Sequence, residues 1–214
     1  MAYYHPTDEL LIRFSAGQMP DALGLMLACH LENCPQCRNR QNLFEQVGGE
    51  LLQHNAELPV TEGLLDSILA KLDQPAAAPK IQTQNAVSSI IPTPLKRFVD
   101  GDYEHLPWSG FIRAIQEINL PFSDSRYTAK LYKIAAGKEL PVHTHRGNEY
   151  TLVMQGSFSD NAGRYHIGDF IQTDTTTVHQ PKAHDEGDCI CFAVIDAPLK
   201  MTGFFGRMLN PFLR

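Results

Sequence analysis

The 214-residue sequence has no long hydrophobic run and no excess of positive charge. No segment approaches the roughly 18 apolar residues of a membrane-spanning helix, and the first residues lack the basic and apolar regions of a secretory signal. Lys and Arg number 18 against 24 Asp and Glu, a net charge of -6, which argues against a protein that binds phosphate backbones. We therefore expect a cytoplasmic protein that contacts neither a membrane nor nucleic acid directly.

Cysteine is scarce, and its five copies fall in two clusters, within residues 29–37 and 189–191. An odd number of cysteines in a reducing compartment favours metal or redox chemistry over structural disulfides. Nine histidines accompany them, so ligands for a metal ion are plentiful.

The charge and the hydrophobic period both change along the chain. Residues 1–72 carry four Lys/Arg against nine Asp/Glu, a net charge of -5, whereas residues 73–214 carry 14 against 15. The first part has the 3.6-residue period of amphipathic helices, the later part has strand-length segments between turn residues, and residues 73–94 are rich in Pro, Ala and uncharged polar side chains. We predict two domains of α and all-β class: a small helical bundle over residues 1–75, a linker over 76–94, and a β-sandwich or barrel over 95–214.

Four short helices are predicted in the first domain. They begin at Asp8 after a Thr7 cap, at Asp21 after Pro20, at Pro35, and at Thr61, and the last three end near Leu31, Gln53 and Leu72. In the second domain, residues 111–118 are predicted to be one strand.

Four residues of the helical domain have the chemistry and spacing of a zinc site: His5, His30, Cys34 and Cys37. His30 lies four residues before Cys34, and Cys37 lies three residues after it, so the three return to nearly the same helical face. A helix restarted at Pro35 would place Cys37 in its first turn, where amide dipoles favour a thiolate. Structural zinc takes four nitrogen or sulfur ligands, and His5 is predicted to be the fourth.

Cys29 competes for a place in this site. It points about 100° away from His30 on a helix, toward the apolar face, which favours a core position. Four protein ligands leave no position for a substrate, so the predicted site is structural and ties the first three helices together.

The pattern His30-x3-Cys34-x2-Cys37 with an upstream His resembles the signature of zinc-binding anti-sigma domains. These small acidic helical units wrap a group IV (ECF, RpoE-like) sigma factor and keep it from RNA polymerase. The resemblance covers about residues 1–75 and implies a 1:1 complex with such a sigma factor. The net charge of -5 fits the capture of a basic sigma surface.

A second cluster of metal ligands lies in the β-rich part: His143, His145, Glu149 and His179. The first two are two residues apart and therefore share one face of a strand, and Glu149 follows across a turn made possible by Gly147. His179 comes eleven residues after Gly168, at the spacing of a following hairpin. These nitrogen and oxygen donors suit Zn, Fe, Mn, Ni or Cu, and the ligand types alone do not choose among them.

The frame Gly137-x5-His143-x-His145-x3-Glu149-x6-Gly156 is similar to the first motif of the cupin family. Cupins are jelly-roll, double-stranded β-helix barrels that hold one metal ion, and the resemblance covers about residues 108–200. A second cupin motif departs from the pattern, because Asp174, Thr176 and Ala183 stand where Pro, Gly and Asn are common. The alternative function is therefore a cupin metalloenzyme, such as an Fe(II) dioxygenase, with an N-terminal zinc docking module.

Cys189 and Cys191 lie in a predicted strand with both thiols on one face. Such positions are about 6.5 to 7 Å apart along the backbone, which is marginal for a direct disulfide. Oxidation to sulfenic acid, or a bridge after rearrangement, is one interpretation, and two small core residues of a barrel strand is the other.

Together, the helical zinc motif, the linker and the cupin motif resemble the zinc anti-sigma factors that carry a C-terminal cupin. This resemblance implies that the helical domain, with Zn2+, inhibits the sigma factor. It also implies that the cupin, with Zn2+ or another divalent metal, drives release under oxidative stress from singlet oxygen or organic peroxide, without catalysis.

Overall fold

The computed structural model describes residues 2–72, 91–99, 101–112, 114–197 and 199–201 of the chain. Four helices precede the β-rich part: α1 (Asp8–Ser15), α2 (Asp21–Asn33), α3 (Pro35–Gln53) and α4 (Leu64–Leu72). As predicted, Thr7 caps α1, where its hydroxyl accepts a hydrogen bond from the Leu10 amide (3.4 Å). None of the helices in the described ranges is long and apolar enough to cross a membrane.

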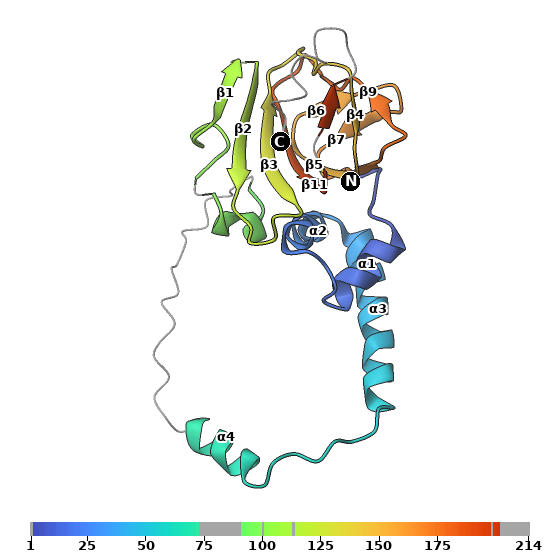
Figure 1. Cartoon of the computed structure of the whole chain (residues 1–214), viewed down its shortest axis with the longest axis vertical. Helices are drawn as coiled ribbons and strands as arrows, with labels where there is room; N and C mark the ends of the chain where they lie inside the picture. Colours follow the sequence, from blue (N-terminus) through green and yellow to red (C-terminus); the bar gives the residue numbers. More distant parts are fainter. Residues whose placement is uncertain (1, 73–90, 100, 113, 198, 202–214) are drawn as a thin grey trace.

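The β-rich part folds into three antiparallel sheets that together form the cupin barrel (Figure 1). The largest has the strand order β1 (Ser109–Ile112), β2 (Ile115–Leu120), β3 (Thr128–Ile134), β11 (Cys189–Ile195), β5 (Glu149–Gln155) and β8 (Phe170–Thr173). The second has β10 (Lys182–Ala183), β6 (Ser157–Ser159) and β7 (Arg164–His166). The third has β12 (Leu199–Met201), β4 (His143–His145) and β9 (Val178–His179). The predicted α plus all-β class with a cupin barrel is confirmed.

One predicted strand is wrong. Residues 111–118 were expected to form one continuous strand, but they are divided between β1 and β2, which pair antiparallel with Ile112 opposite Ile115. Apolar residues stand on both sides of the reversal, at Phe111 and Ile112 and again at Ala114 and Ile115, so the hydrophobic pattern alone does not reveal it.

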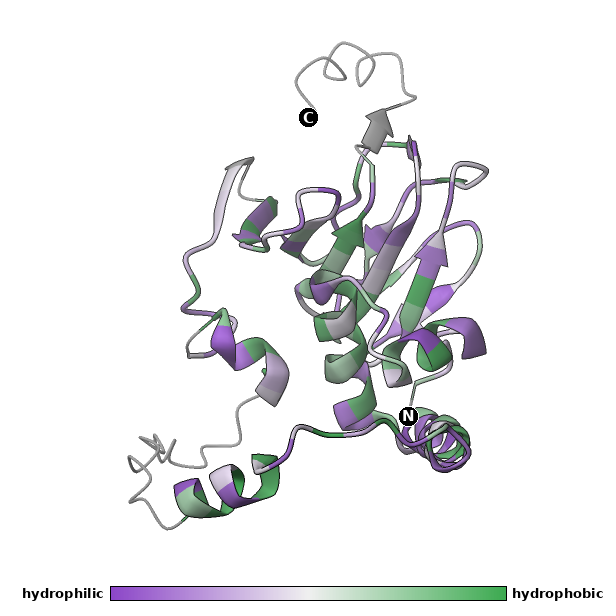
Figure 2. Cartoon of the chain, turned by 60° about the horizontal axis from the view of Figure 1, so that its bottom comes forward, coloured by the Kyte–Doolittle hydropathy of each residue, from purple (hydrophilic) through white to green (hydrophobic). Residues whose placement is uncertain are grey.

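The four predicted helices are present, but they do not pack equally. Helices α1, α2 and α3 contact one another, with Leu11, Met26 and Leu27 fully buried between them and the barrel. Every residue of α4 is exposed, and Figure 1 shows this helix far from the barrel, beyond the end of α3. Its apolar residues lie along one side of the helix, as the hydropathy colours in Figure 2 indicate.

The helical domain and the barrel share one hydrophobic core. Helix α2 lies against the outer face of the large sheet, where Leu23 and Leu27 belong to the same buried cluster as Leu152 and Phe192. A short 3-10 helix, η1 (Thr93–Arg97), packs on α2 through Leu95.

The predicted linker, residues 76–94, lies mainly outside the described residues. Its described end is part of the packed structure, because Ile91 is only 1% exposed. The Thr93 amide also donates a hydrogen bond to Glu32 at the end of α2 (2.8 Å). The residues at the end of the linker therefore pack on the helical domain and bond to it.

Candidate metal centres

The four predicted ligands of the N-terminal site come together from four positions in the chain. His5 lies in the extended segment before α1, His30 lies in the last turn of α2, Cys34 lies between α2 and α3, and Cys37 lies in the first turn of α3. The Pro35 restart therefore produces the predicted convergence. His30 and both cysteines are buried, and His5 is half-buried.

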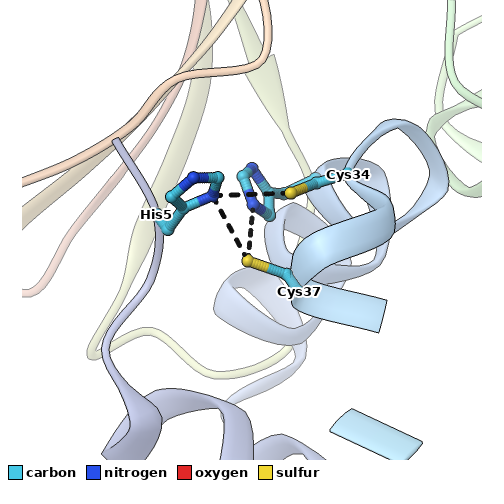
Figure 3. Close-up of side chains that lie close together, drawn as sticks. His5, Cys34 and Cys37 are labelled. Atoms are coloured by element: carbon cyan, nitrogen blue, oxygen red, sulfur yellow. Dashed lines mark hydrogen bonds between the residues drawn. The ribbon is translucent and has the colours of Figure 1, made fainter. Parts of the chain in front are cut away.

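The ligand atoms lie close enough to surround one ion (Figure 3). The Nδ1 atom of His5 is 3.4 Å from each of the two cysteine sulfurs, and the Nε2 atom of His30 is 3.3 Å from the Cys37 sulfur. Nitrogen and sulfur atoms bound tetrahedrally to one zinc ion are about 3.5 Å apart, given bond lengths near 2.0 and 2.3 Å. The donor set and its geometry thus fit zinc.

Burial sets the protonation of this site in the metal-free chain. It raises the pKa of the Cys37 thiol to about 12, an effect strengthened by the hydrogen bond with Cys34. Burial also lowers the pKa of His30 to about 4, so its imidazole is neutral and available as a ligand. A bound cation would supply the positive charge that a buried thiolate needs.

Cys29 is a core residue and not part of the ligand group, as predicted. Its side chain is 1% exposed and lies in the cluster shared by α2 and the large sheet. Burial raises the pKa of its thiol to about 12, so it is protonated at neutral pH.

The cupin site is built on two neighbouring strands. His143 and His145 lie on β4, and His179 lies directly opposite His143 on β9. The Nε2 atom of His179 is 3.1 Å from the Nε2 atoms of both His143 and His145, and all three side chains are buried. Nitrogens that bind one metal ion at about 2.1 Å are about 3.0 Å apart in octahedral and about 3.4 Å apart in tetrahedral coordination, so this triad fits a metal ion.

The second nitrogen of each of these rings faces an oxygen. The Nδ1 atom of His143 donates to the Pro141 carbonyl (2.9 Å), and that of His179 donates to the Asp160 carboxylate (2.8 Å). Because the Pro141 carbonyl only accepts, the proton of a neutral His143 lies on Nδ1 and the Nε2 lone pair is directed at the other two histidines.

Glu149 lies at the start of β5 and contacts the third histidine. Its Oε2 atom is 3.0 Å from Nδ1 of His145, yet neither atom makes a hydrogen bond of good geometry, although both are buried. Burial alone would raise the pKa of Glu149, but the three histidines, His145 foremost, outweigh it and lower this pKa. Glu149 therefore faces the His145 nitrogen that points away from His179, and it is not among the three residues whose ligand atoms converge. Glu149 as a fourth ligand stays a prediction.

Cys189 and Cys191 lie in β11, and both are buried and free. Their sulfur atoms are 3.7 Å apart, so the side chains bring the thiols much closer than the backbone spacing suggested. The hydrogen bond with Cys189, together with burial, raises the pKa of Cys191 well above its usual value. Both thiols belong to a barrel cluster that includes Val153 and Ile134.

The sequence and the fold of this chain are both similar to those of the anti-sigma factor ChrR. A family model described as the ChrR cupin-like domain matches residues 99–197. The anti-sigma-E factor ChrR of Cereibacter sphaeroides is 35% identical over 211 residues, which cover 99% of this chain and 98% of that protein. The chain belongs to the ChrR family. A solved structure of Rhodobacter sphaeroides SigE in complex with the anti-sigma ChrR is also similar, with 34% identity, a TM-score of 0.80, and coverage of 91% of this chain and 100% of that one.

Membership of the ChrR family confirms the resemblance drawn from the two motifs. In this ChrR-family chain the structure brings His5, His30, Cys34 and Cys37 into one group, and His143, His145 and His179 into another. The metal ions themselves, and the redox role of Cys189 and Cys191, stay predictions.

Sequence reasoning missed two carboxylates that support these sites, Asp160 and Asp169. Asp160 holds His179 from the turn between β6 and β7, and Asp169 binds the segment that carries His5. The sequence signal for Asp160 was its place in an Asp-Asn-Ala-Gly turn, where an aspartate side chain accepts amide hydrogen bonds. No sequence signal related Asp169 to a residue 165 positions earlier.

Proposed function

We propose that this chain is an anti-sigma factor that binds and inhibits a group IV (ECF) sigma factor through its N-terminal zinc domain. The observation that carries the proposal is the similarity over nearly the whole chain to ChrR, an anti-sigma factor solved in complex with SigE. The place of action that follows is the cytoplasm, where sigma factors meet RNA polymerase.

The surface of the helical domain supports this proposal. Helix α4 carries five exposed apolar side chains, Leu64, Leu65, Ile68, Leu69 and Leu72. Helix α3 adds four more, Leu43, Val47, Leu51 and Leu52. Exposed apolar surface of this extent on two consecutive helices is typical of a protein interface. The net charge of -5 over residues 1–72 complements a basic sigma surface.

The cupin is proposed to control release. Its buried histidine triad would hold a divalent metal ion, which supplies a Lewis-acidic or redox-active centre within a barrel that also carries the Cys189 and Cys191 thiols. Singlet oxygen or an organic peroxide acting there would favour a state with lower affinity for sigma.

Co-purification of the full chain from its native cell, with metal analysis, tests the proposal. We expect one sigma factor per chain and about two metal ions, of which the N-terminal one is zinc. In Cys37→Ser the zinc count should fall by one, and sigma binding should be lost because the ends of α2 and α3 are no longer held together. Cys29→Ala is the matched control, since it removes a buried thiol outside the ligand group and should keep both.

Two results would contradict the proposal. One is tight sigma binding by Cys37→Ser after its zinc has been lost. The other is turnover of diketone or thiol substrates by the Fe(II)-loaded chain without any sigma binding, which would favour the cupin metalloenzyme instead.

A further inference from the structure

The turn that precedes β8 connects the cupin to the N-terminal metal site. The turn joins β7 to β8 and contains Gly168 and Asp169. One of these residues bonds a predicted ligand directly, and the other bonds the segment that carries a second ligand.

Asp169 holds the segment that leads to His5. Its side chain is completely buried, and one carboxylate oxygen accepts hydrogen bonds from the backbone amides of Tyr3 (2.5 Å) and Tyr4 (3.0 Å). The other oxygen accepts from the His166 amide within the turn (2.7 Å). A carboxylate that accepts three backbone amide hydrogen bonds holds the N-terminal segment firmly and in one orientation on the turn.

Further contacts fix the same segment along the barrel. The Phe170 amide donates to the Tyr4 carbonyl (3.0 Å), which continues the pairing along β8. The ring of Tyr4 packs on that of Tyr165, with centroids 4.9 Å apart. His5 follows directly, so its position depends on how this segment is docked.

Gly168 holds the other ligand. Its carbonyl accepts a hydrogen bond from Nδ1 of His30 (2.9 Å), which leaves Nε2 of a neutral His30 free to face Cys37. A partner of this kind fixes the tautomer and orientation of a metal-binding histidine. The turn adopts this shape because Gly168 has a φ of +90°, which side chains rarely permit.

The same turn is bonded to the interior of the barrel. The Gly168 amide donates to the Val153 carbonyl (2.9 Å), and the Val153 amide donates to the Asp169 carbonyl (3.1 Å). Val153 lies on β5, the strand that begins at Glu149, and pairs with Cys191 on β11. A change in the barrel at Glu149 or Cys191 can therefore reach the turn through β5.

We propose that the Gly168–Asp169 turn is a latch through which the cupin keeps the N-terminal metal site assembled, with Asp169 as a positioning residue for His5. The proposal rests on the proposed metal binding at His5, His30, Cys34 and Cys37. When the latch opens, the His5 segment is released and the His30 ring loses its partner, so the metal ion dissociates faster. The cupin thereby acts on the metal site of the sigma-binding domain.

The rate of metal loss from the full-length chain tests the latch. The protein is loaded with Co2+, and the thiolate-to-cobalt charge-transfer absorption is followed after excess EDTA is added. Among the described residues only the N-terminal group contains thiolate ligands, so this signal reports that site and not the histidine triad. Asp169→Asn and a deletion of residues 2–4 disrupt the latch from its two sides.

We expect both variants to lose cobalt about 10- to 100-fold faster than the unaltered chain, the usual cost of removing a supporting contact at a metal site. Asp102→Asn is the matched control, because Asp102 also accepts two backbone amide hydrogen bonds but is exposed, and those bonds come from Glu104 and His105, which belong to neither ligand group; its rate should be unchanged.

The outcomes separate the latch from the metal site itself. Rates within twofold of the unaltered chain in both latch variants would overturn the latch. A chain that shows no thiolate-to-cobalt absorption before any substitution would instead overturn the proposed metal site. If Asp169→Asn unfolds the barrel, the deletion of residues 2–4, which leaves the turn intact, still decides the question.

Discussion

Histidines at both metal sites are held by the ring nitrogen that does not face the other ligands. Gly168 holds His30, Pro141 holds His143 and Asp160 holds His179, in each case by a hydrogen bond of 2.8 or 2.9 Å. Such a contact fixes the orientation of the ring before a metal arrives, so less entropy is lost on binding.

The contact of Asp160 with His179 can be tested by a single substitution. Burial alone would raise the pKa of its carboxyl, but hydrogen bonds from His179 and from the Ala162 and Gly163 amides outweigh burial and lower it. Because this pKa is lower in the folded chain, the carboxylate contributes stability above the unfolded value of about 3.9, and this contribution is lost as the pH falls through the folded value.

We expect Asp160→Asn to weaken metal binding at the histidine triad about 10- to 100-fold. In the metal-free chain it should lower the free energy of unfolding by about 1 to 3 kcal/mol at pH 7, and by progressively less below about pH 4. Chelator competition and denaturant unfolding at several pH values measure the two effects.

Asp174→Asn is the control for this substitution. Asp174 is exposed, and its carboxylate accepts amide hydrogen bonds only within its own turn. A loss of metal affinity as large in Asp174→Asn as in Asp160→Asn would show that the contact with His179 is not the cause.

At the scale of elements, α4 differs from the other helices. It has nine residues, all exposed, and a helix this short is marginal in water without tertiary packing. Its apolar stripe is therefore expected to gain its packing from the sigma factor.

Leu65→Glu tests this role of α4. Leu65 is 67% exposed, so the substitution should change the free energy of unfolding by no more than about 0.5 kcal/mol. A charge buried without a partner in the complex should lower sigma affinity about 100-fold or more. Isothermal titration with the purified sigma factor gives the affinity.

Ser67→Glu adds the same charge on the opposite side of α4, and its affinity should match that of the unaltered chain. Equal affinities for Leu65→Glu and the unaltered chain would mean that α4 does not dock on sigma.

At the scale of the whole molecule, the cupin and the helical domain form one body. Helix α2 buries Leu23 and Leu27 against the sheet that contains β5 and β11, so the barrel and the helical domain share a core. A signal in the barrel therefore has a structural route to the sigma-binding helices, which two domains joined only by a linker would lack.

His143→Ala separates inhibition from release. It removes a ligand on β4 that lies far from α3 and α4 in Figure 1, so inhibition of the sigma factor should be unchanged. Induction of a sigma-dependent reporter by singlet oxygen or organic peroxide should fall to near the uninduced level.

His105→Ala is the control, because His105 is exposed and pairs only with Asp102. Normal induction in the His143→Ala strain would remove the cupin metal site from the response.

The order of helices and strands, and the separation of the chain into a helical and a β-rich part, followed from local patterns. The cap at Thr7, the helix start at Pro35, the change of hydrophobic period, and ligand spacings of two to four residues act over one or two turns of chain. The same local spacings predicted His30, Cys34 and Cys37 in one cluster and His143 and His145 in the other, whereas His5 followed from the need for a fourth zinc ligand and His179 from its spacing after Gly168. The hairpin within residues 111–118 was missed because its apolar residues fit a continuous strand.

Contacts between distant segments were decided only by the tertiary structure. Asp169 meets Tyr3 and Tyr4 because the N-terminal segment docks along β8, and α4 stays unpacked because the shared core is completed without it. The lack of long hydrophobic runs and of excess positive charge excluded whole classes of protein from the sequence alone. How the cupin is joined to the metal site of its helical domain depends on packing across more than 100 residues, which no local pattern encodes.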